Sequence, residues 1–288
     1  MKQRQAVILA AGRGSRLGSI LNGKPKCLLE VGGRPLISYQ IEILRSLGIE
    51  RICVVVGHGA GYVYESLDDE ISFVVNPRYS DTNSLFSLWL AGAWVDGPFA
   101  MMNSDLIAHP KVYERILNSG KTCLAYDSSS GMQEEHMKIQ IEDGAVRAIR
   151  KSLPIKLSAG ENVGILNFEE EEARSVLIEA DRLVREGKTS HWSPAAIDGI
   201  AHQHRFEAVD IADLSWTEID FPEDLEFARK TVWNEVKNEL PNGQRDSRKQ
   251  NSKAGKIHLK SERLKNLLRG GGSPASASIY RIPAWPVA

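Results

Sequence analysis

A glycine-rich segment flanked by basic residues is the part of the sequence best suited to bind phosphate. Residues 9–17 read LAAGRGSRL and follow an apolar run. Gly12 and Gly14 allow a backbone to approach a ligand closely, and the two arginines of the segment add positive charge. Lys24 and Lys26 supply two more cations further along the chain. We expect a helix after the glycines, with free N–H groups facing an anion. The combination suits a triphosphate.

The glycine spacing by itself leaves the kind of loop open. A dinucleotide-binding loop would read G-x-G-x-x-G, and Gly12, Gly14 and Gly18 miss that spacing by one residue. A P-loop would place a lysine after its last glycine, but Ser19 follows Gly18. On the glycines alone, a structural turn is an equal alternative.

Two aspartates follow apolar segments and could hold a metal ion. Asp105 ends the predicted strand 98–105, and Asp220 ends the segment SWTEID. Attack on a phosphate assisted by Mg²⁺ needs carboxylates that hold the cation against the phosphates. Asp220 could instead cap the helix that begins at Pro222. The acidic neighbours are expected to be solvated or capping; they are Asp213, Glu218, Glu223 and Asp224.

The elements that must position these residues alternate between strands and helices over the first 127 residues. Apolar runs predict strands at 5–11, 27–31, 51–57, 71–76, 98–105 and 121–127, and helical spacing predicts helices at 35–48, 84–94 and 111–120. This alternation predicts the α/β class with parallel strands. Beyond it we expect a hairpin at 136–151, strands at 161–168, 206–211 and 215–220, and helices at 169–187 and 222–240.

Composition separates the chain into a body and a tail. The 288 residues carry a net charge of −1, yet residues 245–288 hold ten Lys or Arg against two acids. We expect a domain over 1–241 and a basic, Gly/Pro/Ser-rich, disordered tail over 242–288, with a short basic helix at 256–269. No apolar run approaches the length of a membrane span, and the three cysteines suggest buried thiols in a reducing cytoplasm. We do not expect nucleic acid to be a partner.

The glycine segment together with the later KPKCLLEVGGRPLI resembles the nucleotidyltransferases that activate sugar phosphates and small phosphoalcohols. Their motif reads L-A-A-G-x-G-[ST]-R-[LM] with a later P-K-x-L, and every position is filled here. The resemblance covers residues 5–235. It implies a three-layer, Rossmann-like α/β fold with a mixed, mostly parallel sheet and a small inserted β region, and it implies Mg²⁺ and a nucleoside triphosphate.

The same resemblance assigns roles to individual residues. Arg16 and Lys26 would hold phosphates and act in catalysis, and Asp105 and Asp220 would ligate the metal. The nucleotide would lie along the glycine segment, at Leu9, Ala10, Ala11, Gly12, Gly14 and Ser15.

The stretch 76–88 bears on the choice of base. It looks like the N-x-x-Y-x-x-x-N-[NS]-x-x-S-L stretch of bacterial choline-phosphate cytidylyltransferases, where the sugar-nucleotide enzymes usually carry a glutamine and glycines. This likeness favours CTP over dTTP or UTP. Thr82, Asn83 and Ser84 are the candidates for reading the base and ribose, and Ser84 could instead cap the helix that follows.

The residues expected to bind the acceptor lie later in the chain. Lys138, Lys151 and Glu161 resemble acceptor-side residues of the cytidylyltransferases that activate phosphonates and inositol phosphate, although either lysine could be a surface residue. Where the choline enzymes tend to place an aromatic residue, this chain has His136. Trp192, with Tyr79, would form only an incomplete aromatic cage. Phosphocholine, 2-aminoethylphosphonate, a hydroxyalkyl phosphonate and inositol 1-phosphate all stay open as acceptors.

The sequence therefore predicts Mg²⁺-dependent transfer of CMP from CTP to a small phosphate- or phosphonate-bearing acceptor, with release of pyrophosphate. One alternative is a sugar-1-phosphate nucleotidyltransferase that uses UTP, dTTP or GTP. Another is a catalytically silent regulatory module, which the intact Arg16, Lys26, Asp105 and Asp220 argue against. A homodimer is left open.

Overall fold

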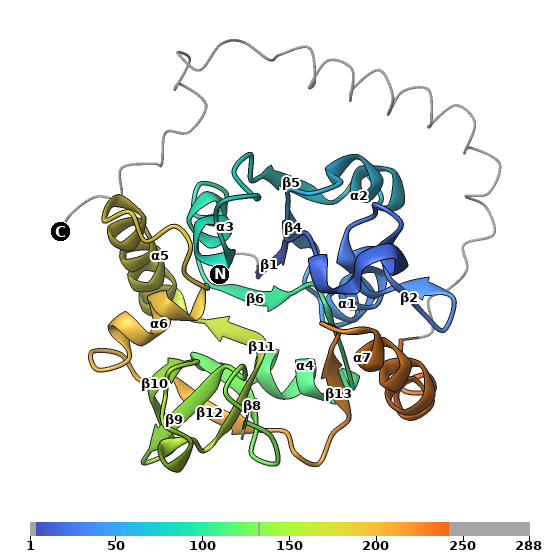
Figure 1. Ribbon diagram of the computed structural model, residues 1–288. Helices are drawn as coiled ribbons and strands as arrows, with labels where there is room; N and C mark the ends of the chain where they lie inside the picture. Colours follow the sequence, from blue (N-terminus) through green and yellow to red (C-terminus); the bar gives the residue numbers. More distant parts are fainter. Residues whose placement is uncertain (1–3, 132, 242–288) are drawn as a thin grey trace, which may run out of the picture.

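The computed structural model of the protein describes residues 4–131 and 133–241 (Figure 1). Within these residues a nine-stranded sheet has the order β5-β4-β1-β6-β11-β8-β12-β10-β9. The predicted boundary at 242, the tail 242–288 and the basic helix 256–269 lie outside the described residues.

One half of the sheet is parallel. It contains β1 (Gln5–Ala10), β4 (Arg51–Val56), β5 (Ser72–Val75) and β6 (Phe99–Asn103). Strand β1 pairs in parallel with β4 on one side and β6 on the other, and all six of its residues are buried. Continuous apolar runs form such strands because helices cover both faces. The carboxyl ends of these strands therefore meet at one edge.

The other half of the sheet is mainly antiparallel. It contains β8 (Cys123–Asp127), β9 (Lys138–Glu142), β10 (Ala145–Arg150), β11 (Gly160–Phe168) and β12 (Glu207–Asp210). Strand β11 runs antiparallel to β6, β8 and β9, whereas β12 and β8 are parallel. The predicted hairpin at Asp143 and Gly144 joins β9 to β10. The sheet is mixed as predicted, and parallel pairing dominates only in its first half because the hairpin and β11 reverse direction.

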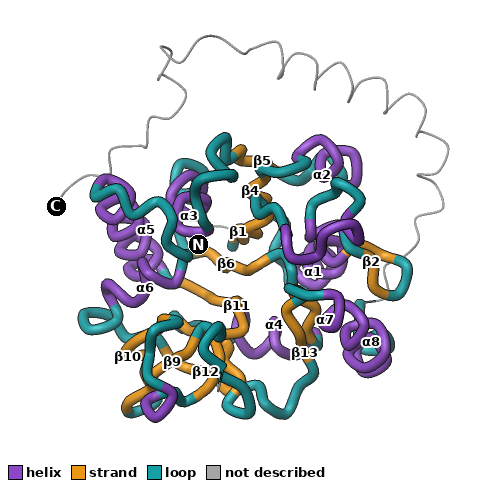
Figure 2. The backbone as a smooth tube through the Cα atoms, viewed as in Figure 1, coloured by secondary structure: helices purple, strands orange, loops and turns teal. Residues whose placement is uncertain are grey.

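Helices cover both faces of the sheet, giving three layers (Figures 1 and 2). One face carries α1 (Leu36–Ser46), α2 (Ala60–Ser66) and α4 (Pro110–Leu117), and the other carries α3 (Ser84–Ala91), α5 (Glu170–Arg185) and α6 (Pro194–Ile200). Along β1, Ala6 and Ile8 belong to the first core, and Val7 and Leu9 to the second. This alternation is the two-residue period of a strand, and each large aliphatic side chain so buried contributes about 1.5–3 kcal/mol.

A small ribbon brings two distant segments together beside the sheet edge. Strand β7 (Leu106–Ala108) pairs antiparallel with β13 (Trp216–Glu218), and the N–H of Ile219 donates to the carbonyl of Asp105. The C-terminal helical segment follows as α7 (Pro222–Phe227), a π-helical turn at Ala228–Val232 and α8 (Trp233–Val236). The predicted helix 222–240 therefore forms over residues 222–236, with a π-helical turn inside it. The β7–β13 pairing is the reason that Asp105 and Asp220 meet.

The structure tests two local predictions near the glycine segment. After Gly14 the chain forms a helix, as predicted; it is a 3₁₀ helix at Ser15–Leu21, which is kinked at Gly18. The kink follows from the backbone at Gly18, whose φ of 50° lies in the left-handed region. The expected strand at 27–31 is instead a 3₁₀ turn (Lys26–Leu28) and the short β2 (Glu30–Val31), which pairs with β3 (Arg34–Pro35). A further 3₁₀ turn spans Ile155–Leu157.

Two general expectations can be compared with the described residues. Cys27, Cys53 and Cys123 are free and buried, as predicted. Among the helices in the described part of the chain, none is long and apolar enough to cross a membrane.

Candidate active site

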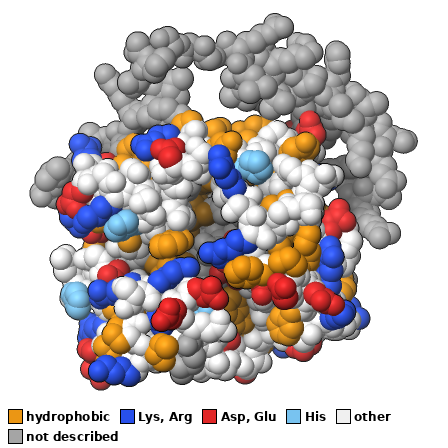
Figure 3. Space-filling model, viewed as in Figure 1, with side chains coloured by type: hydrophobic (Ala, Val, Ile, Leu, Met, Phe, Trp, Pro, Cys, Tyr) orange, Lys and Arg blue, Asp and Glu red, His pale blue; other side chains and the backbone are white. Residues whose placement is uncertain are grey.

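A cleft of about 780 Å³ opens at the carboxyl ends of the parallel strands. Figure 3 shows a hollow across this face of the molecule, with basic and acidic side chains gathered on its rim. Ligands of α/β proteins bind at this edge of a sheet. The structure brings nearly all of the predicted site residues into its lining, namely Leu9, Ala10, Ala11, Gly12, Gly14, Ser15, Arg16, Lys26, Thr82, Asn83, Ser84, Asp105, Lys151, Glu161, Trp192 and Asp220. Lys138 does not line it.

Glycines shape the wall formed by the first loop. A Cβ atom on Gly12 would have no protein atom within 4 Å, so the backbone there faces open space. Gly14 has a φ of 62°, a left-handed conformation that favours glycine. A Cβ atom on Gly57 would come within 2.8 Å of the Ala11 carbonyl oxygen, so this position needs glycine for the two loops to pack. The loop therefore presents its backbone to a ligand, as the sequence predicts.

The two predicted cations and the two predicted metal ligands form one ionic cluster. The Nζ atom of Lys26 lies 2.8 Å from Oδ2 of Asp105 and also contacts the carboxylate of Asp220. The Nη1 atom of Arg16 lies 2.8 Å from Oδ2 of Asp220. The lysine is mostly buried, and the arginine is half exposed. Positive charge thus stands beside both carboxylates, where a triphosphate would need it.

The charges in this cluster stabilise one another. Burial alone would lower the pKa of Lys26, but Asp105 and Asp220 raise it well above its ordinary value. Burial alone would raise the pKa of Asp220, but Lys26 and Arg16 lower it below its ordinary value. Both groups therefore stay ionised around neutral pH, and the ammonium remains available to an anion.

A third carboxylate completes a candidate metal site. Oxygen atoms of Asp105, Glu218 and Asp220 all lie within 4.8 Å of one another. Repulsion from Asp105, followed by burial, raises the pKa of Glu218 to about 8. The Oδ1 atom of Asp105 is buried and has no hydrogen-bond partner among the described residues. Clustered carboxylate oxygens with one unpaired member fit a hard divalent cation.

Glu218 was expected to be solvated or capping, and that expectation is wrong. The sequence did carry a signal for it, because Glu218 and Asp220 stand two residues apart in an extended segment and such residues share a face. The capping alternative for Asp220 is also wrong. Asp224 accepts from the N–H groups of Asp220 and Phe221 and so caps the helix itself. The side chain of Asp220 is left to face the cations.

The residues expected to read the base lie along the start of α3. Asn83 is the N-cap: its side-chain Oδ1 accepts from the N–H of Ser84 at 2.8 Å. Ser84 therefore does not cap the helix, and its hydroxyl accepts from the N–H of Ser193 at 2.7 Å. The Thr82 hydroxyl is held by Asn76 and by the carbonyl of Arg78. Because Oδ1 of Asn83 is engaged, its amide nitrogen is the group left to donate to a ligand.

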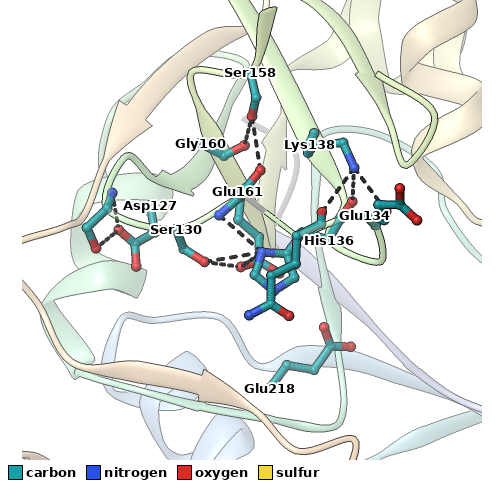
Figure 4. A network of polar contacts seen from close by, with 12 residues as sticks. Asp127, Ser130, Glu134, His136, Lys138, Ser158, Gly160, Glu161 and Glu218 are labelled. Atoms are coloured by element: carbon teal, nitrogen blue, oxygen red, sulfur yellow. Dashed lines mark hydrogen bonds and ion pairs between the residues drawn. The ribbon is translucent and has the colours of Figure 1, made fainter. Parts of the chain in front are cut away.

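The two lysines expected to bind the acceptor have different surroundings. The Nζ atom of Lys151 lies 4.8 Å from the centre of the Trp192 ring, at the cleft. Lys138 is almost fully buried, and its Nζ donates to the carbonyl oxygens of Gln133 and Glu134 at 3.1 and 2.9 Å (Figure 4). An ammonium saturated by carbonyl groups holds a loop in place. The predicted acceptor role of Lys138 is therefore not supported.

Glu161 lies in the cleft within a polar network. Its Oε2 accepts from the hydroxyl of Ser130 and lies 3.2 Å from Nδ1 of His136 (Figure 4). Burial is the largest influence on this carboxyl, and it raises the pKa of Glu161 above its ordinary value, although Ser130, His136 and Lys151 act in the opposite direction. Lys151 also lowers the pKa of Asp220, so its charge is felt at both Glu161 and the carboxylate cluster.

A mixed α/β sheet with this cleft is typical of nucleotide-binding proteins. Comparison with known proteins identifies the family. Residues 6–154 match the family of MobA-like NTP transferase domains. The chain is 31% identical over 242 residues to CMP-5'-(3-aminopropyl)phosphonate synthase of Streptomyces rubellomurinus, covering 76% of this chain and 37% of that protein. It is 26% identical over 228 residues to the bifunctional IPC transferase and DIPP synthase of Aquifex aeolicus, covering 78% and 51%.

A solved structure supports the fold. The inositol-1-phosphate CTP transferase from T. maritima matches with a TM-score of 0.68 at 20% identity, over 84% of this chain and 97% of that one. The chain spans between about a third and half of the length of the two curated relatives. It belongs to the MobA-like NTP transferase domain family, because more than half of its residues match that family. The predicted nucleotidyltransferase fold is confirmed.

Proposed function

We propose that the protein is a Mg²⁺-dependent cytidylyltransferase that transfers CMP from CTP to a small acceptor bearing a phosphate or phosphonate group, with release of pyrophosphate. One observation carries the proposal. Arg16 and Lys26 contact the Asp105–Asp220 carboxylates inside a cleft whose wall is the open backbone of the glycine loop. Cations for a triphosphate and oxygens for a divalent cation are thus in one place.

The reaction needs no nucleophile from the protein. An oxygen of the acceptor, anionic near neutral pH, attacks the α-phosphorus of CTP; a new P–O bond forms as the bond to the β-phosphate breaks, and pyrophosphate leaves. A divalent cation held by the three carboxylates would neutralise charge on the triphosphate. Lys26 and Arg16 stabilise the charge that develops on the leaving phosphates, and the cleft holds donor and acceptor in line.

Base recognition falls to the glycine loop and to Asn83. Cytosine differs from uracil by an exocyclic amine and a ring nitrogen that accepts, so a site must offer an acceptor and a donor. Backbone groups at Ala10 to Gly12 supply both kinds, and the amide nitrogen of Asn83 supplies a donor. The relative from Streptomyces rubellomurinus is named for CMP and the structure from T. maritima for CTP, and both support this choice of nucleotide.

The acceptor would bind between the carboxylate cluster and Glu161. The charge of Lys151 acts to lower the pKa of Glu161 on one side of this region and of Asp220 on the other. Its ammonium lies over the Trp192 ring. We assign Lys151 to the phosphate or phosphonate of the acceptor and Glu161 to its other end. The relatives named for a phosphonate and for inositol 1-phosphate support an acceptor of this class.

A pyrophosphate-release screen tests the proposal. CTP, UTP, dTTP, ATP and GTP would each be offered with Mg²⁺ and with phosphocholine, 2-aminoethylphosphonate, a hydroxyalkyl phosphonate, inositol 1-phosphate and glucose 1-phosphate. Release should require both nucleotide and acceptor, and CTP should lead by at least about tenfold in kcat/KM, since a buried group left unpaired costs about 1–3 kcal/mol. Preference for UTP or dTTP with glucose 1-phosphate would support the sugar-nucleotide alternative instead.

A further inference from the structure

Asp105 lies in a two-residue turn between two strands. Strand β6 ends at Asn103 and β7 begins at Leu106, so Ser104 and Asp105 form the turn. The carboxylate of Asp105 accepts a hydrogen bond from Lys26 through Oδ2, and among the described residues its Oδ1 has no partner. A divalent cation bound there would take the place of that ammonium. The position of the carboxylate must therefore come from the backbone of the turn.

Main-chain hydrogen bonds hold the turn at two points. The N–H of Ser104 donates to the carbonyl of Leu9 at 3.3 Å, and the N–H of Ile219 donates to the carbonyl of Asp105 at 2.9 Å. The first bond joins the turn to β1, and the second joins it to the segment that follows β13. Both bonds act on the two turn residues themselves.

Gln40 bridges the two residues that flank the turn. Its Nε2 donates to the carbonyl of Asn103 at 2.8 Å and, through a longer bond of 3.4 Å, to the carbonyl of Leu106. A side-chain amide has two N–H donors, so one nitrogen can serve both carbonyl groups. The amide thus ties together the end of β6 and the start of β7, between which Asp105 lies.

The side chain of Gln40 is set among apolar residues of α1. It is 1% exposed, and the other buried residues of this helix are aliphatic or aromatic, namely Leu36, Ile37, Tyr39, Ile41, Ile43 and Leu44. Helix α1 packs against β7 (Figure 1). A buried amide costs free energy unless it is hydrogen-bonded, and close packing leaves it few other positions. The two carbonyl groups are therefore held against a fixed helix.

The other aspartate of the ionic cluster is supported in a similar way. The N–H of Asp220 donates to Oδ2 of Asp224 at 2.8 Å. Asp224 is not one of the three clustered carboxylates, and Gln40 is not one of the residues that line the cleft. Each aspartate of the candidate cation site thus lies in a backbone segment held by a side chain that does not belong to the carboxylate cluster.

From these contacts we infer that Gln40 is a positioning residue, which acts through Asp105 to keep the carboxylate where a divalent cation and the ammonium of Lys26 can reach it. Replacing residues that orient a metal ligand through hydrogen bonds changes metal affinity or activity by about ten- to a hundredfold. This role rests on the proposed function, because there Asp105 binds the cation that accompanies the nucleotide. Metal affinity should therefore depend on a residue that touches no ligand.

Binding of Mn²⁺ alone tests this role without turnover. Gln40→Met removes both N–H donors and keeps an unbranched side chain. Gln5→Met is the matched control, because Gln5 is equally buried and its Nε2 donates to Asp96 at 3.1 Å, at the start of β1 and away from the cleft. Followed by electron paramagnetic resonance, the dissociation constant for Mn²⁺ should rise by about tenfold or more in Gln40→Met and stay unchanged in Gln5→Met.

A double-variant cycle shows whether Gln40 acts through Asp105. Asp105→Asn should weaken Mn²⁺ binding at least as much as Gln40→Met does, and adding Gln40→Met to Asp105→Asn should cause no further loss. A loss of the same size in both backgrounds would show that Gln40 acts on the fold in general, and would overturn the inference. Gln40→Leu, whose side chain has a different shape, should repeat the effect of Gln40→Met. Melting temperatures identify which of the two variants to use.

Turnover separates this role from the proposed function. Gln40→Met should need about tenfold more Mg²⁺ than the unchanged chain for half-maximal pyrophosphate release, and high Mg²⁺ should restore most of its rate but not that of Asp105→Asn. Mn²⁺ binding that depends on Gln40 would support the role even if the protein used another nucleotide. Unchanged Mn²⁺ affinity in the Gln40 variants, or no Mn²⁺ binding by the unchanged chain, would overturn the role, whereas cytidylyl transfer would still be judged by the pyrophosphate screen.

Discussion

The phosphate side and the acceptor side of the cleft hold their lysines in opposite ways. Lys26 is paired with two carboxylates that a metal ion would also use, so we expect its partners to change when nucleotide and metal bind. Lys138 is saturated by backbone carbonyl groups, so its partners do not change. Lys151 lies over the Trp192 ring and donates no hydrogen bond to another described residue, so we propose that its N–H donors serve a ligand. All three residues are lysines and carry the same ammonium group. The groups around each ammonium therefore decide its function.

The largest expected effect comes from removing a carboxylate of the phosphate side. Asp105→Asn and Asp220→Asn should each lower turnover by at least about a hundredfold while the protein stays folded, because each removes a charged oxygen where the triphosphate and its cation meet. Pyrophosphate release and melting temperature are the measurements. Asp213→Asn is the matched control, since Asp213 pairs with Arg115 on the surface. Near-normal rates in both cleft variants would show that the assigned site is wrong.

Replacing Lys26 should lower the catalytic efficiency and raise the affinity for a divalent metal ion. Lys26→Met should lower kcat/KM by roughly ten- to a hundredfold, since a charged hydrogen bond contributes about 1.5–3 kcal/mol. It should also tighten binding of Mn²⁺ in the absence of nucleotide, because the ammonium no longer competes for Asp105 and Asp220. Titration followed by electron paramagnetic resonance measures the second effect. Lys230→Met, which removes a surface pair with Glu226, should change neither property. Weaker Mn²⁺ binding in Lys26→Met would argue against competition.

The contrast between Lys138 and Lys151 can be tested directly. Lys138→Met should destabilise the fold by about 1–3 kcal/mol, because carbonyl groups are left unpaired, with little change in the KM for the acceptor. Lys151→Met should raise that KM by about tenfold or more with almost no change in stability, since within residues 4–131 and 133–241 its ammonium makes a cation–π contact and no hydrogen bond. Urea unfolding and steady-state kinetics give the two quantities. If Lys138→Met raised the KM for the acceptor and Lys151→Met lowered stability, the roles proposed for the two lysines would be exchanged.

The smallest effect is expected at Asn83. Asn83→Ala removes the N-cap of α3, which costs about 0.5–2 kcal/mol of stability. It also removes the amide donor proposed to read the base, so the preference for CTP over UTP should narrow by several-fold. Asn83→Ser keeps a capping oxygen and lacks the amide nitrogen, and it should restore stability without restoring selectivity. Full selectivity in both variants would assign base recognition to the backbone alone.

The sequence predicts the phosphate side of the cleft better than the acceptor side. On the phosphate side, the motif places Gly12, Gly14 and Arg16 directly after a buried strand and Lys26 a short distance further along the chain. The parallel sheet fixes where that strand ends. Their position in the cleft follows from local patterns. That Asp220 meets Asp105 required the β7–β13 pairing, which strands of only three residues do not reveal in the sequence.

On the acceptor side, the direction of a side chain depends on tertiary packing. Lys138 begins an irregular hairpin whose register shifts between Val146 and Ala148, and the preceding loop folds back over its ammonium. No residue pattern distinguishes it from Lys151. Glu218 was also missed, but in its case the sequence did contain a signal, the two-residue spacing to Asp220.

The most direct test of cytidylyl transfer at this cleft is a ³¹P NMR spectrum of the reaction of CTP, Mg²⁺ and 2-aminoethyl phosphate with the full chain, repeated with Asp105→Asn. We expect signals of free pyrophosphate and of a new diphosphate bridge joining CMP to the acceptor, in equal amounts, and the variant should form neither at a comparable rate. Formation of CDP, release of pyrophosphate without the bridged product for any phosphate or phosphonate acceptor, or an unchanged rate in Asp105→Asn would contradict it.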